Sequence, residues 1–377
     1  MKEVPMASQE SRADFHRDPL QFLDQAFPAA GDAVWLPGRR LCLSEAEASR
    51  AVLVNDEDLY EDHSDFFHTR RGNFGPRSAQ VEMGRSARTL LRAHLRERAD
   101  KLPAAVQALA PVSEWPDAGN WLAYRHFADA LIAPDSPARL RAGVEQIVHR
   151  AVLAGARERY SRLTRAVFRF RVMRELGRAV RERRKRAGEP VDVLDVVARA
   201  APEAPERELA EVFLSFLFAA AGSVGFVLGW SLYLMGTHPD SEAEPSRVVR
   251  EALRLWPVAW LLARRPIRPH EVAGTAVTPE NEVIVCPYAV HRNPRHWEDP
   301  HAYRPERWAA DHDPRAFIPF GWGPHRCIAG TLSMQMVEDV LQILDDNFRL
   351  TVTPHGNHPH VSAALAPPRF SLTLEPR

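Results

Sequence analysis

The sequence contains few cysteines and carries no net charge, and these two features narrow the possible functions. Only three of its 377 residues are cysteine, and the wide spacing of Cys42, Cys286 and Cys327 offers neither a disulfide framework nor a Cys-x-x-Cys metal motif. A reducing cytoplasm is therefore the expected location. Lys and Arg together number 49, as do Asp and Glu, so no excess of charge exists to attract nucleic acid. We expect a small or neutral ligand instead.

One long apolar segment raises the question of a membrane span. Residues 1–20 lack the apolar core of a signal peptide, but residues 212–235 run for 24 residues without a charge, and about 20 suffice to cross a bilayer. Three glycines interrupt this segment, and neither end carries an aromatic belt or a positive cluster. A helix that is apolar all round can also be the central helix of a large protein. We expect a buried core helix and no membrane partner.

The hydrophobic pattern predicts a mainly α protein with small β sheets, in the α+β fold class. Helical segments are predicted at 84–110, 138–188 and 206–235. Strand pairs are predicted at 32–44 and 275–290, and two further strands are predicted near the C-terminus.

The predicted organisation is a single large domain over residues 1–377, with one protomer acting alone. A chain of this length can form one large unit or two domains, and its core can be sizeable in either case. Residues 1–17 are expected to lack regular structure, and residues 189–208 and 236–246 are expected to form loops.

The stretch "FGWGPHRCIAG", residues 320–330, concentrates unusual residues around one cysteine. Its three glycines permit close backbone approaches that a Cβ would block: Gly321, Gly323 and Gly330. Such a loop can lie flat against a large planar group, as a thiolate ligand to heme iron requires. A predicted helix follows Cys327, and its dipole together with His325 and Arg326 favours the thiolate form. Cys42 and Cys286 lack this setting and are expected to be small buried side chains.

The spacing Phe-Gly-x-Gly-x-His-x-Cys-x-x-Gly resembles the heme-binding loop of the cytochrome P450 family. The resemblance implies that Cys327 is the iron ligand and that the loop binds the cofactor through Phe320, Gly321, Gly323, His325 and Gly330. "EALRLWP" resembles the Glu-x-x-Arg helix of the family, and "YRPERW" resembles the segment that completes its Glu-Arg-Arg triad. The matching positions are Glu251, Arg254 and Arg307. From about residue 18 nearly the whole chain is similar, which implies the P450 fold around a buried heme b.

Heme carries two propionates, and buried carboxylates need cationic partners. Three positions resemble the propionate-binding pattern of the family: His325, Arg264 and Arg88. Arg88 can equally be a surface arginine on a charged helix. The family usually has His or Trp four residues before it, whereas this chain has Gly84, so one propionate contact is expected to be absent or replaced.

The long apolar segment departs from the family at the place where dioxygen is activated. Its "AAAGSV" stands where Ala-Gly-x-Asp/Glu-Thr-Thr is usual, which places Ser223 at the alcohol position and Gly222 at the acid position. A shift of two residues would place Gly225 at the alcohol position instead. In the family this pair positions water and delivers protons, a role that a hydroxyl can relay but glycine cannot. In either alignment the acid is missing.

Three functions are compatible with these residues. The first is a monooxygenase that takes electrons from NAD(P)H through a ferredoxin and a ferredoxin reductase, and hydroxylates or oxidatively cyclises a small, largely apolar metabolite of a bacterial biosynthetic pathway. The second is dioxygen-independent chemistry, with peroxide as oxidant or with rearrangement or cyclisation of a substrate that carries an N–O or O–O bond. The third is a heme-thiolate sensor without turnover. We expect residues 60–82, 218–223 and 258–262 to line the pocket, with Arg70 and Arg71 in a solvated loop.

Overall fold

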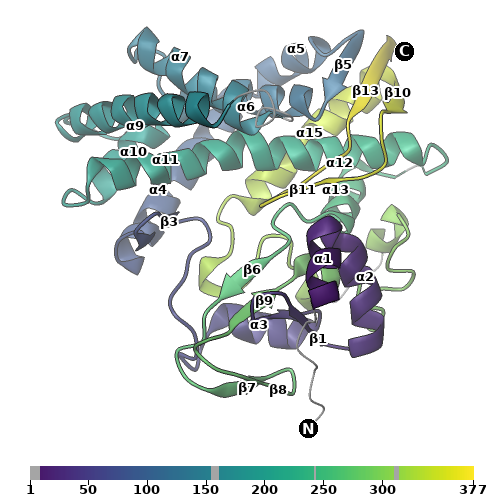
Figure 1. The fold of residues 1–377 in the computed structure, drawn as a ribbon. Helices are drawn as coiled ribbons and strands as arrows, with labels where there is room; N and C mark the ends of the chain where they lie inside the picture. Colours follow the sequence, from purple (N-terminus) through teal and green to yellow (C-terminus); the bar gives the residue numbers. More distant parts are fainter. Residues whose placement is uncertain (1–8, 154–160, 242, 310–313) are drawn as a thin grey trace. The chain divides into compact units, whose positions relative to one another are not determined.

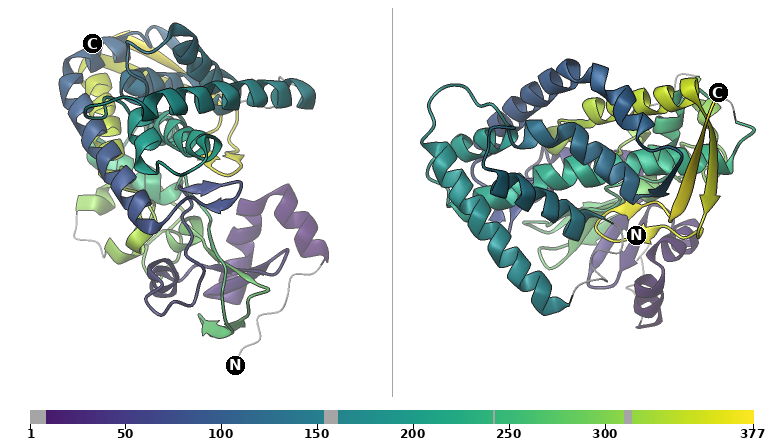
Figure 2. Two further views of the ribbon diagram at one scale, coloured as in Figure 1. Left: turned by 90° about the vertical axis from the view of Figure 1, so that its left-hand side faces the viewer. Right: turned by 90° about the horizontal axis from the view of Figure 1, so that it is seen from above.

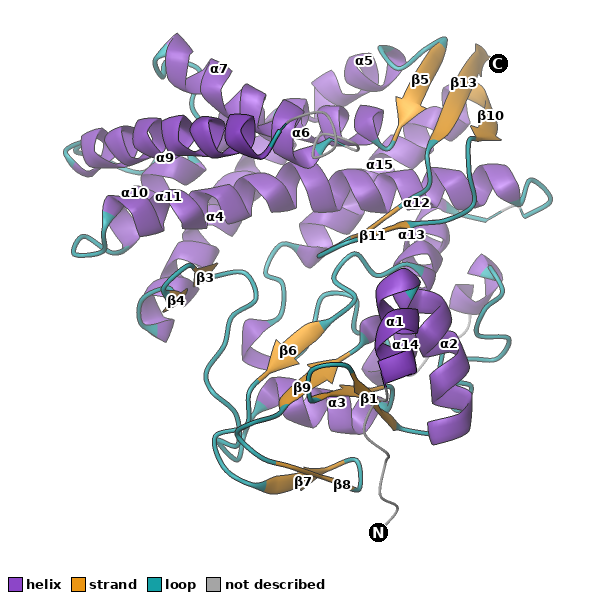
Figure 3. Ribbon diagram, viewed as in Figure 1, coloured by secondary structure: helices purple, strands orange, loops and turns teal. Residues whose placement is uncertain are grey.

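The structure, a computed structural model, describes residues 9–153, 161–241, 243–309 and 314–377. Its contacts divide the chain into two compact units, although the sequence predicts a single domain. The first unit comprises Met1–Asp65, Asp240–Cys327 and Pro359–Ala366, and the second comprises Phe66–Pro239, Ile328–His358 and Pro367–Arg377. Helices dominate the described residues and the strands are short (Figure 3). This balance agrees with the mainly α class with small sheets.

The first unit contains a four-stranded sheet with the order β1-β2-β9-β6. β1 (Ala33–Leu36) and β2 (Arg40–Leu43) form the predicted antiparallel pair, β2 runs parallel to β9 (Glu282–Val285), and β6 (Leu262–Arg264) runs antiparallel to β9 (Figure 1). The predicted pairing within 275–290 is wrong, because β8 (Thr275–Val277) pairs with β7 (His270–Val272). The run "VIV" in β9 is buried and takes a central position between two other strands, which propensity alone does not reveal.

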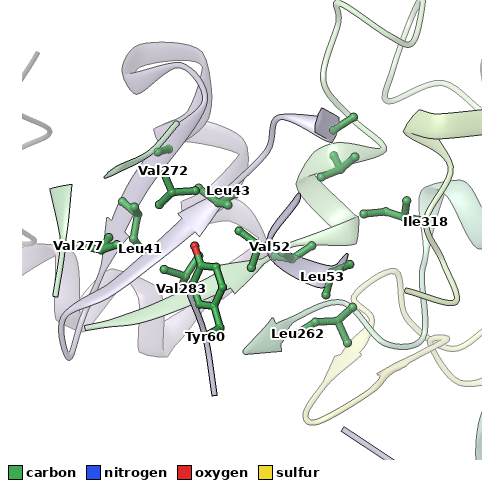
Figure 4. Packing of buried hydrophobic residues seen from close by; sticks show 14 of the residues in the cluster. Leu41, Leu43, Val52, Leu53, Tyr60, Leu262, Val272, Val277, Val283 and Ile318 are labelled. Atoms are coloured by element: carbon green, nitrogen blue, oxygen red, sulfur yellow. The ribbon is translucent and has the colours of Figure 1, made fainter. Parts of the chain in front are cut away.

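The helices and remaining strands of the first unit surround this sheet. They are α1 (Gln9–Arg17), α2 (Pro19–Ala30), α3 (Ala46–Val54), α13 (Pro245–Leu255), α14 (Pro287–Val290), η4 (Pro305–Ala309), η5 (Pro314–Ala316), η6 (Gly323–His325), β11 (His360–Val361) and β12 (Leu365–Ala366). Figure 4 shows one core cluster, in which Leu41 and Val283 of the sheet, Leu53 of α3 and Ile318 are buried. Ile318 lies two residues before Phe320, so this core anchors the segment that enters the cysteine loop.

Helix α1 corrects the expectation that residues 1–17 lack regular structure. Residues 1–8 lie outside the described residues, but Gln9–Arg17 form a helix. Its Phe15 is 7% exposed and packs edge-on against Phe22 of α2, and the guanidinium of Arg40 lies over the Phe15 ring. Tertiary packing therefore orders a segment whose polar sequence does not predict a stable helix.

The second unit is mostly helical and contains one small sheet. Its helices are α4 (Arg77–Glu97), η1 (Ala99–Lys101), α5 (Leu102–Gln107), α6 (Asp117–Leu131), α7 (Ala138–Ile147), η2 (Val148–Val152), α9 (Arg162–Arg184), α10 (Val193–Ala200), α11 (Glu206–Phe218), η3 (Ala219–Ser223), α12 (Val224–Thr237) and α15 (Gly330–Asn347). The sheet has the order β10-β13-β5, from Phe348–Pro354, Phe370–Pro376 and Val112–Trp115, with β10 and β13 paired along their length (Figure 2). A hairpin joins β3 (His68–Thr69) to β4 (Gly72–Asn73).

The elements α11, η3 and α12 form one long helical run over the predicted segment 206–235 (Figure 1). By length and composition Glu206–Thr237 is the one helix among the described residues that could cross a membrane, and 61% of its most apolar window is buried. Within the second unit this run contacts α6, α9, α15 and β10. Contacts with so many elements agree with the expected core helix.

Helix α10 lies in a segment expected to form a loop. Its residues Val193–Ala200 form a helix that Asp192 caps by accepting a hydrogen bond from the backbone N–H of Asp195. The Arg183 side chain of α9 pairs with both carboxylates at 2.8 Å, and all three side chains are buried. This buried ion network depends on a residue from a separate helix, which the local sequence does not show.

Candidate heme-thiolate site

The cysteine loop is shaped by two glycines with left-handed backbone conformations. Gly321 has φ +70° and Gly323 has φ +69°, which side-chain-bearing residues rarely adopt. A Cβ at Gly323 would lie 3.0 Å from the Leu53 carbonyl oxygen and from Val54 Cα at the end of α3. The Cys327 N–H donates a hydrogen bond to the Phe320 carbonyl oxygen at 2.9 Å, which closes the turn. The loop is therefore pressed against α3 in a way that only glycine allows.

Cys327 differs from the other two cysteines in its surroundings. Cys42 and Cys286 are fully buried in the core of the first unit, as expected, and burial raises the pKa of the Cys42 thiol well above its ordinary value. The Cys327 side chain is exposed within its loop. A thiol that is to bind a ligand must present its sulfur outside the packed core, and among the three cysteines only Cys327 does so.

Behind the loop, Glu251 is the centre of a buried hydrogen-bond network. Arg254 donates to it twice, from Nε to Oε2 at 2.9 Å and from Nη2 to Oε1 at 2.8 Å, and Arg307 donates from Nε to Oε1 at 3.2 Å. The backbone N–H of Arg304 and the indole N–H of Trp308 each add a hydrogen bond at 2.9 Å. The structure thus brings together the three side chains that the sequence pattern singled out. Five donors hold one carboxylate.

Arg254 also ties α13 to the segment that leads to the loop. Its guanidinium donates to the carbonyl oxygens of His291, Pro300 and Ala302 at 2.9, 2.7 and 2.9 Å. Arg307 donates likewise to the carbonyl oxygen of Glu298 at 2.9 Å. A buried charge needs such complete hydrogen bonding to avoid a large desolvation cost. The network fixes the backbone between α14 and η4.

His291 extends this network toward the cysteine loop, and the sequence reasoning missed it. The Ile318 N–H donates to His291 Nε2 at 2.9 Å, so Nδ1 carries the proton and donates to the Arg254 carbonyl oxygen at 3.1 Å. Burial, reinforced by the positive charge of Arg254, lowers the pKa of His291 to about 3. The neutral imidazole therefore links α13 to the segment before Phe320.

The two propionate-binding candidates in the first unit each lie against an aspartate. His325 Nε2 lies 2.7 Å from Asp62 Oδ1, and Arg264 Nη1 donates to Asp65 Oδ2 at 3.0 Å. Arg264 is nearly buried, at 4% exposure of its side chain. Both aspartates come from the short stretch "DHSD", residues 62–65, which lies in the predicted pocket lining 60–82 but was not predicted to contact the propionate-binding candidates.

Arg88 and Gly84 lie on α4 in the second unit. The Nε atom of Arg88 is buried and has no hydrogen-bond partner among the described residues. This orphaned donor argues against a purely solvated arginine. A Cβ at Gly84 would lie 3.2 Å from Cδ1 of Ile328, so the residue after Cys327 fills the space that a side chain at position 84 would need. An apolar side chain thus stands where the family usually has His or Trp.

The long helix contains a π-helical turn, η3, at the predicted oxygen-activation positions. Ser223 is half-buried at the end of this turn, and Gly222 is buried. A Cβ at Gly222 would meet Val152 Cγ1 at 3.6 Å, an ordinary contact with an apolar side chain. A Cβ at Gly225 would instead lie 2.5–2.7 Å from atoms of Asn120 in α6. Position 225 therefore has no room for a side chain, which argues against the shifted alignment.

Asn120 is a further residue that the sequence did not reveal. Its side-chain amide is fully buried, and Nδ2 lies 2.9 Å from the Ala221 carbonyl oxygen and 3.2 Å from that of Gly222. A π-helical turn displaces backbone carbonyls from the regular helical ladder. Asn120 supplies a donor to two of them and so stabilises the turn that carries Ser223.

The segment 66–74 packs on the beginning of the long helix within the second unit. Phe66 meets Phe216 edge-on at 4.8 Å between ring centroids, and Phe67 lies at 6.2 Å from the same ring. Arg71 forms an ion pair with Glu208 at 3.0 Å, and the Arg70 N–H donates to Glu211 at 3.0 Å. Both arginine side chains remain exposed, at 55% and 75%, as expected of a solvated loop, and acidic residues of α11 lie beside them.

Comparison with known proteins relates this chain to the cytochrome P450 family. The sequence profile described as Cytochrome P450 matches residues 246–374, which contain the Glu251 network and the cysteine loop. The C-terminal third of the chain thus matches the cytochrome P450 family. Two solved P450 structures resemble it over nearly its full length: a cytochrome P450DA heme domain, with TM-score 0.72, 18% identity and coverage of 100% of this chain and 97% of that chain, and a zebra fish cytochrome P450 with abiraterone, with TM-score 0.74, 19% identity and coverage of 96% and 99%. They confirm the P450 fold.

Curated P450 relatives match in part. Cytochrome P450 4V2 of Mus musculus is 29% identical over 36% of this chain and 32% of its own length. Cyclooctat-9-en-7-ol 5-monooxygenase of Streptomyces melanosporofaciens is 27% identical over 46% of this chain and 45% of its own, and human cytochrome P450 3A5 is 31% identical over 38% and 34%. The matches thus cover between about a third and just under half of each of these relatives' length.

The P450 fold implies heme, and the residues present fit that group. Cys327 offers an exposed sulfur beside a glycine-shaped turn, and Arg264 and His325 offer donors in the same unit. Within the first unit, one soft sulfur ligand and the donors of Arg264 and His325 suit an iron porphyrin with propionates. In the second unit, the buried Nε of Arg88 is a donor without a partner among the described residues.

Proposed function

We propose that this protein is a heme-thiolate monooxygenase that hydroxylates or oxidatively cyclises a small, largely apolar metabolite, as in the biosynthetic pathways of bacteria. The observation that carries the proposal is the exposed Cys327 thiol in a loop clamped to α3 and connected through His291 to the buried Glu251 network. A rigid support of this kind serves a ligand whose position must not vary.

The residues of the site would have different roles in such an enzyme. Cys327 would bind the heme iron, and Arg264, His325 and Arg88 would bind the propionates. When bound, a thiolate-ligated heme supplies oxidising power toward unactivated carbon–hydrogen bonds. Ser223 Oγ would relay a proton from ordered water, and the Phe66–Phe216 contact would contribute an apolar wall that excludes bulk water.

The relatives give the proposed substrate class some support. The name of one Streptomyces relative describes oxidation of a cyclic alkenol, a largely hydrocarbon compound with one hydroxyl. For this chain the aromatic contacts of Phe66, Phe67 and Phe216 favour a ligand of similar apolar character. Arg71 pairs with Glu208 at 3.0 Å and Arg70 Nε lies 4.0 Å from Glu211, which leaves less positive charge to receive an acidic substrate group.

The test compares two sources of electrons. The purified protein is reduced under carbon monoxide, once with dithionite and once with NADPH and a surrogate ferredoxin and ferredoxin reductase. We expect the spectrum typical of a thiolate-ligated ferrous heme in both cases. If neither reductant produces this spectrum, the proposal fails. If only dithionite does, the heme assignment holds and delivery of electrons from NADPH is contradicted.

A second candidate is oxidation that takes its oxidant from peroxide or from the substrate. Gly222 favours it, because the usual acid is replaced by a residue that faces Val152 in a buried position. Loss of the proton-delivering acid is most harmful where dioxygen must be activated, because that route needs protons from the protein. A heme-thiolate sensor shares the same ligand, and it would bind carbon monoxide without forming product from any oxidant.

A substitution at Gly222 separates these candidates. Gly222→Asp places a carboxyl group at the usual acid position, where the Cβ meets only an ordinary contact with Val152. If the missing acid limits a monooxygenase, dioxygen-supported product formation rises while peroxide-supported formation stays constant. If neither rises and the wild type already turns over faster with peroxide, the second candidate is favoured. Gly222→Ala is the matched control, because it adds the Cβ without the acid.

A further inference from the structure

The two acidic residues of the stretch 62–65 lie on the cations that are expected to bind the heme propionates. Asp62 Oδ1 is 2.7 Å from His325 Nε2, and Asp65 Oδ2 accepts a hydrogen bond from Arg264 Nη1 at 3.0 Å. All four residues belong to the first unit. Two carboxylates spaced three residues apart thus meet two cations that lie more than 60 residues apart in the chain. We call these four residues the clasp.

The contact between Asp65 and Arg264 has the character of a partly desolvated ion pair. The Arg264 side chain is 4% exposed and that of Asp65 is 37% exposed. Burial raises the pKa of Asp65, but hydrogen bonds and charge from His63 and Arg264 outweigh it and hold the pKa below its ordinary value. Asp65 is therefore a carboxylate at neutral pH. Asp62 is 61% exposed, so its contact with His325 is expected to be weaker.

A guanidinium can serve two carboxylates, but its charge is then shared between them. Arg264 Nη1 already donates to Asp65 and to the Ala263 carbonyl oxygen, and the remaining donors lie on the same planar fork. A propionate that binds Arg264 therefore meets a competing negative charge within the same ion cluster. Like-charged carboxylates at one cation weaken each other's binding.

We propose that Asp65, supported by Asp62, competes with the heme propionates for the hydrogen-bond donors of Arg264 and His325. The clasp thereby couples cofactor retention to the order of the segment 61–65: tighter binding of heme loosens that segment, and a tighter segment weakens the hold on heme. Asp65 is followed directly in the sequence by Phe66, which lies in the proposed apolar wall. The inference rests on the proposed function, because it takes Arg264 and His325 as the propionate partners.

The test measures heme retention and segment order in the heme-loaded protein. The variant Asp65→Asn removes the competing charge with little change of shape. We expect heme transfer to excess apomyoglobin to slow by about twofold to fivefold, the fold-change that corresponds to losing one partly exposed ion pair. Hydrogen exchange of the amides of residues 61–65 should become faster in the same variant. Asp62→Asn should change both quantities in the same direction by less.

Matched variants separate competition from other effects. Asp65→Glu keeps the carboxylate and should restore wild-type heme transfer. Asp56→Asn removes the same charge from an exposed position in the same unit and should leave the transfer rate unchanged. In an Arg264→Gln background, Asp65→Asn should have no further effect, because the shared cation is gone.

The opposite results overturn the inference. Heme transfer that is unchanged or faster in Asp65→Asn would show that Asp65 does not compete with the propionates. An equal slowing by Asp56→Asn would reduce the effect to net charge. If the carbon-monoxide spectrum of the wild type lacks the thiolate-ligated heme, the proposed function and this inference fall together. If that spectrum is present and Asp65→Asn behaves as the wild type, only the competition is refuted.

Discussion

Different interactions stabilise the Glu251 network of the first unit and the π-helical turn η3 of the second unit. Around Glu251 the two arginines of the predicted triad and two further groups provide five donors to one fully buried carboxylate. At η3 the family motif is absent. The buried side-chain amide of Asn120, from α6, donates hydrogen bonds to two backbone carbonyl oxygens of the turn. The comparison teaches that the Glu251 network matches the motifs read from the sequence, whereas the π-helical turn depends on a contact with Asn120 that the sequence did not reveal.

The largest expected effect is a loss of stability from a substitution in the Glu251 network. Glu251→Gln leaves Arg254 and Arg307 buried without their carboxylate, so the free energy of unfolding should fall by about 3–5 kcal/mol. Urea unfolding followed by circular dichroism measures this loss. Glu306→Gln is the matched control: its carboxylate is 62% exposed and pairs with Arg304, so a change of about 0.5 kcal/mol is expected. Equal losses in the two variants would contradict the role of Glu251.

The next largest effect is on the rate of oxidation, from a substitution at Ser223 in η3. If Ser223 relays protons, Ser223→Ala should reduce dioxygen-supported oxidation by about 10²-fold and leave peroxide-supported oxidation nearly unchanged. The measurement uses an apolar probe compound selected by its shift of the heme absorption band on binding. Ser215→Ala is the control, because Ser215 lies two turns earlier on the same helical run. A monooxygenase whose dioxygen-supported rate is insensitive to Ser223→Ala would refute this relay.

Two glycine variants test how the helical run around the π-helical turn η3 is packed. Gly225→Ala forces a Cβ to within 2.7 Å of Asn120 backbone atoms and should cost about 1–3 kcal/mol of stability. Gly222→Ala meets only an ordinary contact at 3.6 Å, and it should be neutral or slightly stabilising, because alanine favours helix by about 1 kcal/mol. Thermal unfolding compares the two. The packing account is wrong if Gly222→Ala proves the more destabilising variant.

The last effect concerns pH and accumulates gradually, over several pH units. The pKa of His291 is lowered from 6.5 to about 3 in the folded protein, so between these values the unfolded chain binds the proton and the folded chain does not. Stability from this group is present above pH 6.5 and is lost as the pH falls toward 3, by at most about 1.4 kcal/mol per pH unit. His126, whose pKa is lowered to about 4, acts in the same direction.

Urea titrations at several pH values test this, with His291→Gln and His126→Asn compared with the wild type. His291→Gln should flatten the slope below pH 6.5, and His126→Asn should leave the part due to His291 in place. A slope that His291→Gln does not change would show that this histidine is not held neutral.

The sequence predicted the parts of the fold that local pattern determines. The strand pair at 32–44 and the long helical run through Gly222 and Ser223 follow from short-range periodicity and turn residues. It did not predict helix α10, because a charge from the distant Arg183 stabilises it. The misassigned partner of β9 has the same cause, since strand pairing is a long-range contact.

The candidate site shows the same division. Cys327, Glu251 and Arg254 stand in motifs whose spacing carries the chemistry. His291, Asn120 and the two aspartates of the clasp act through contacts with residues 27 to 263 positions away, as in the hydrogen bonds of His291 and His325. No local signal marks such a residue. Only the folded arrangement shows that the two aspartates contact Arg264 and His325, the residues that are expected to bind the propionates.

The central claim is that Cys327 is a thiolate ligand to heme, and one measurement tests it most directly. Wild-type protein and Cys327→Ala are purified, reduced with dithionite and saturated with carbon monoxide, and their absorption spectra are compared. The account predicts the red-shifted band of a thiolate-ligated heme for the wild type and its loss in the variant. The same band in both proteins would contradict the assignment of Cys327.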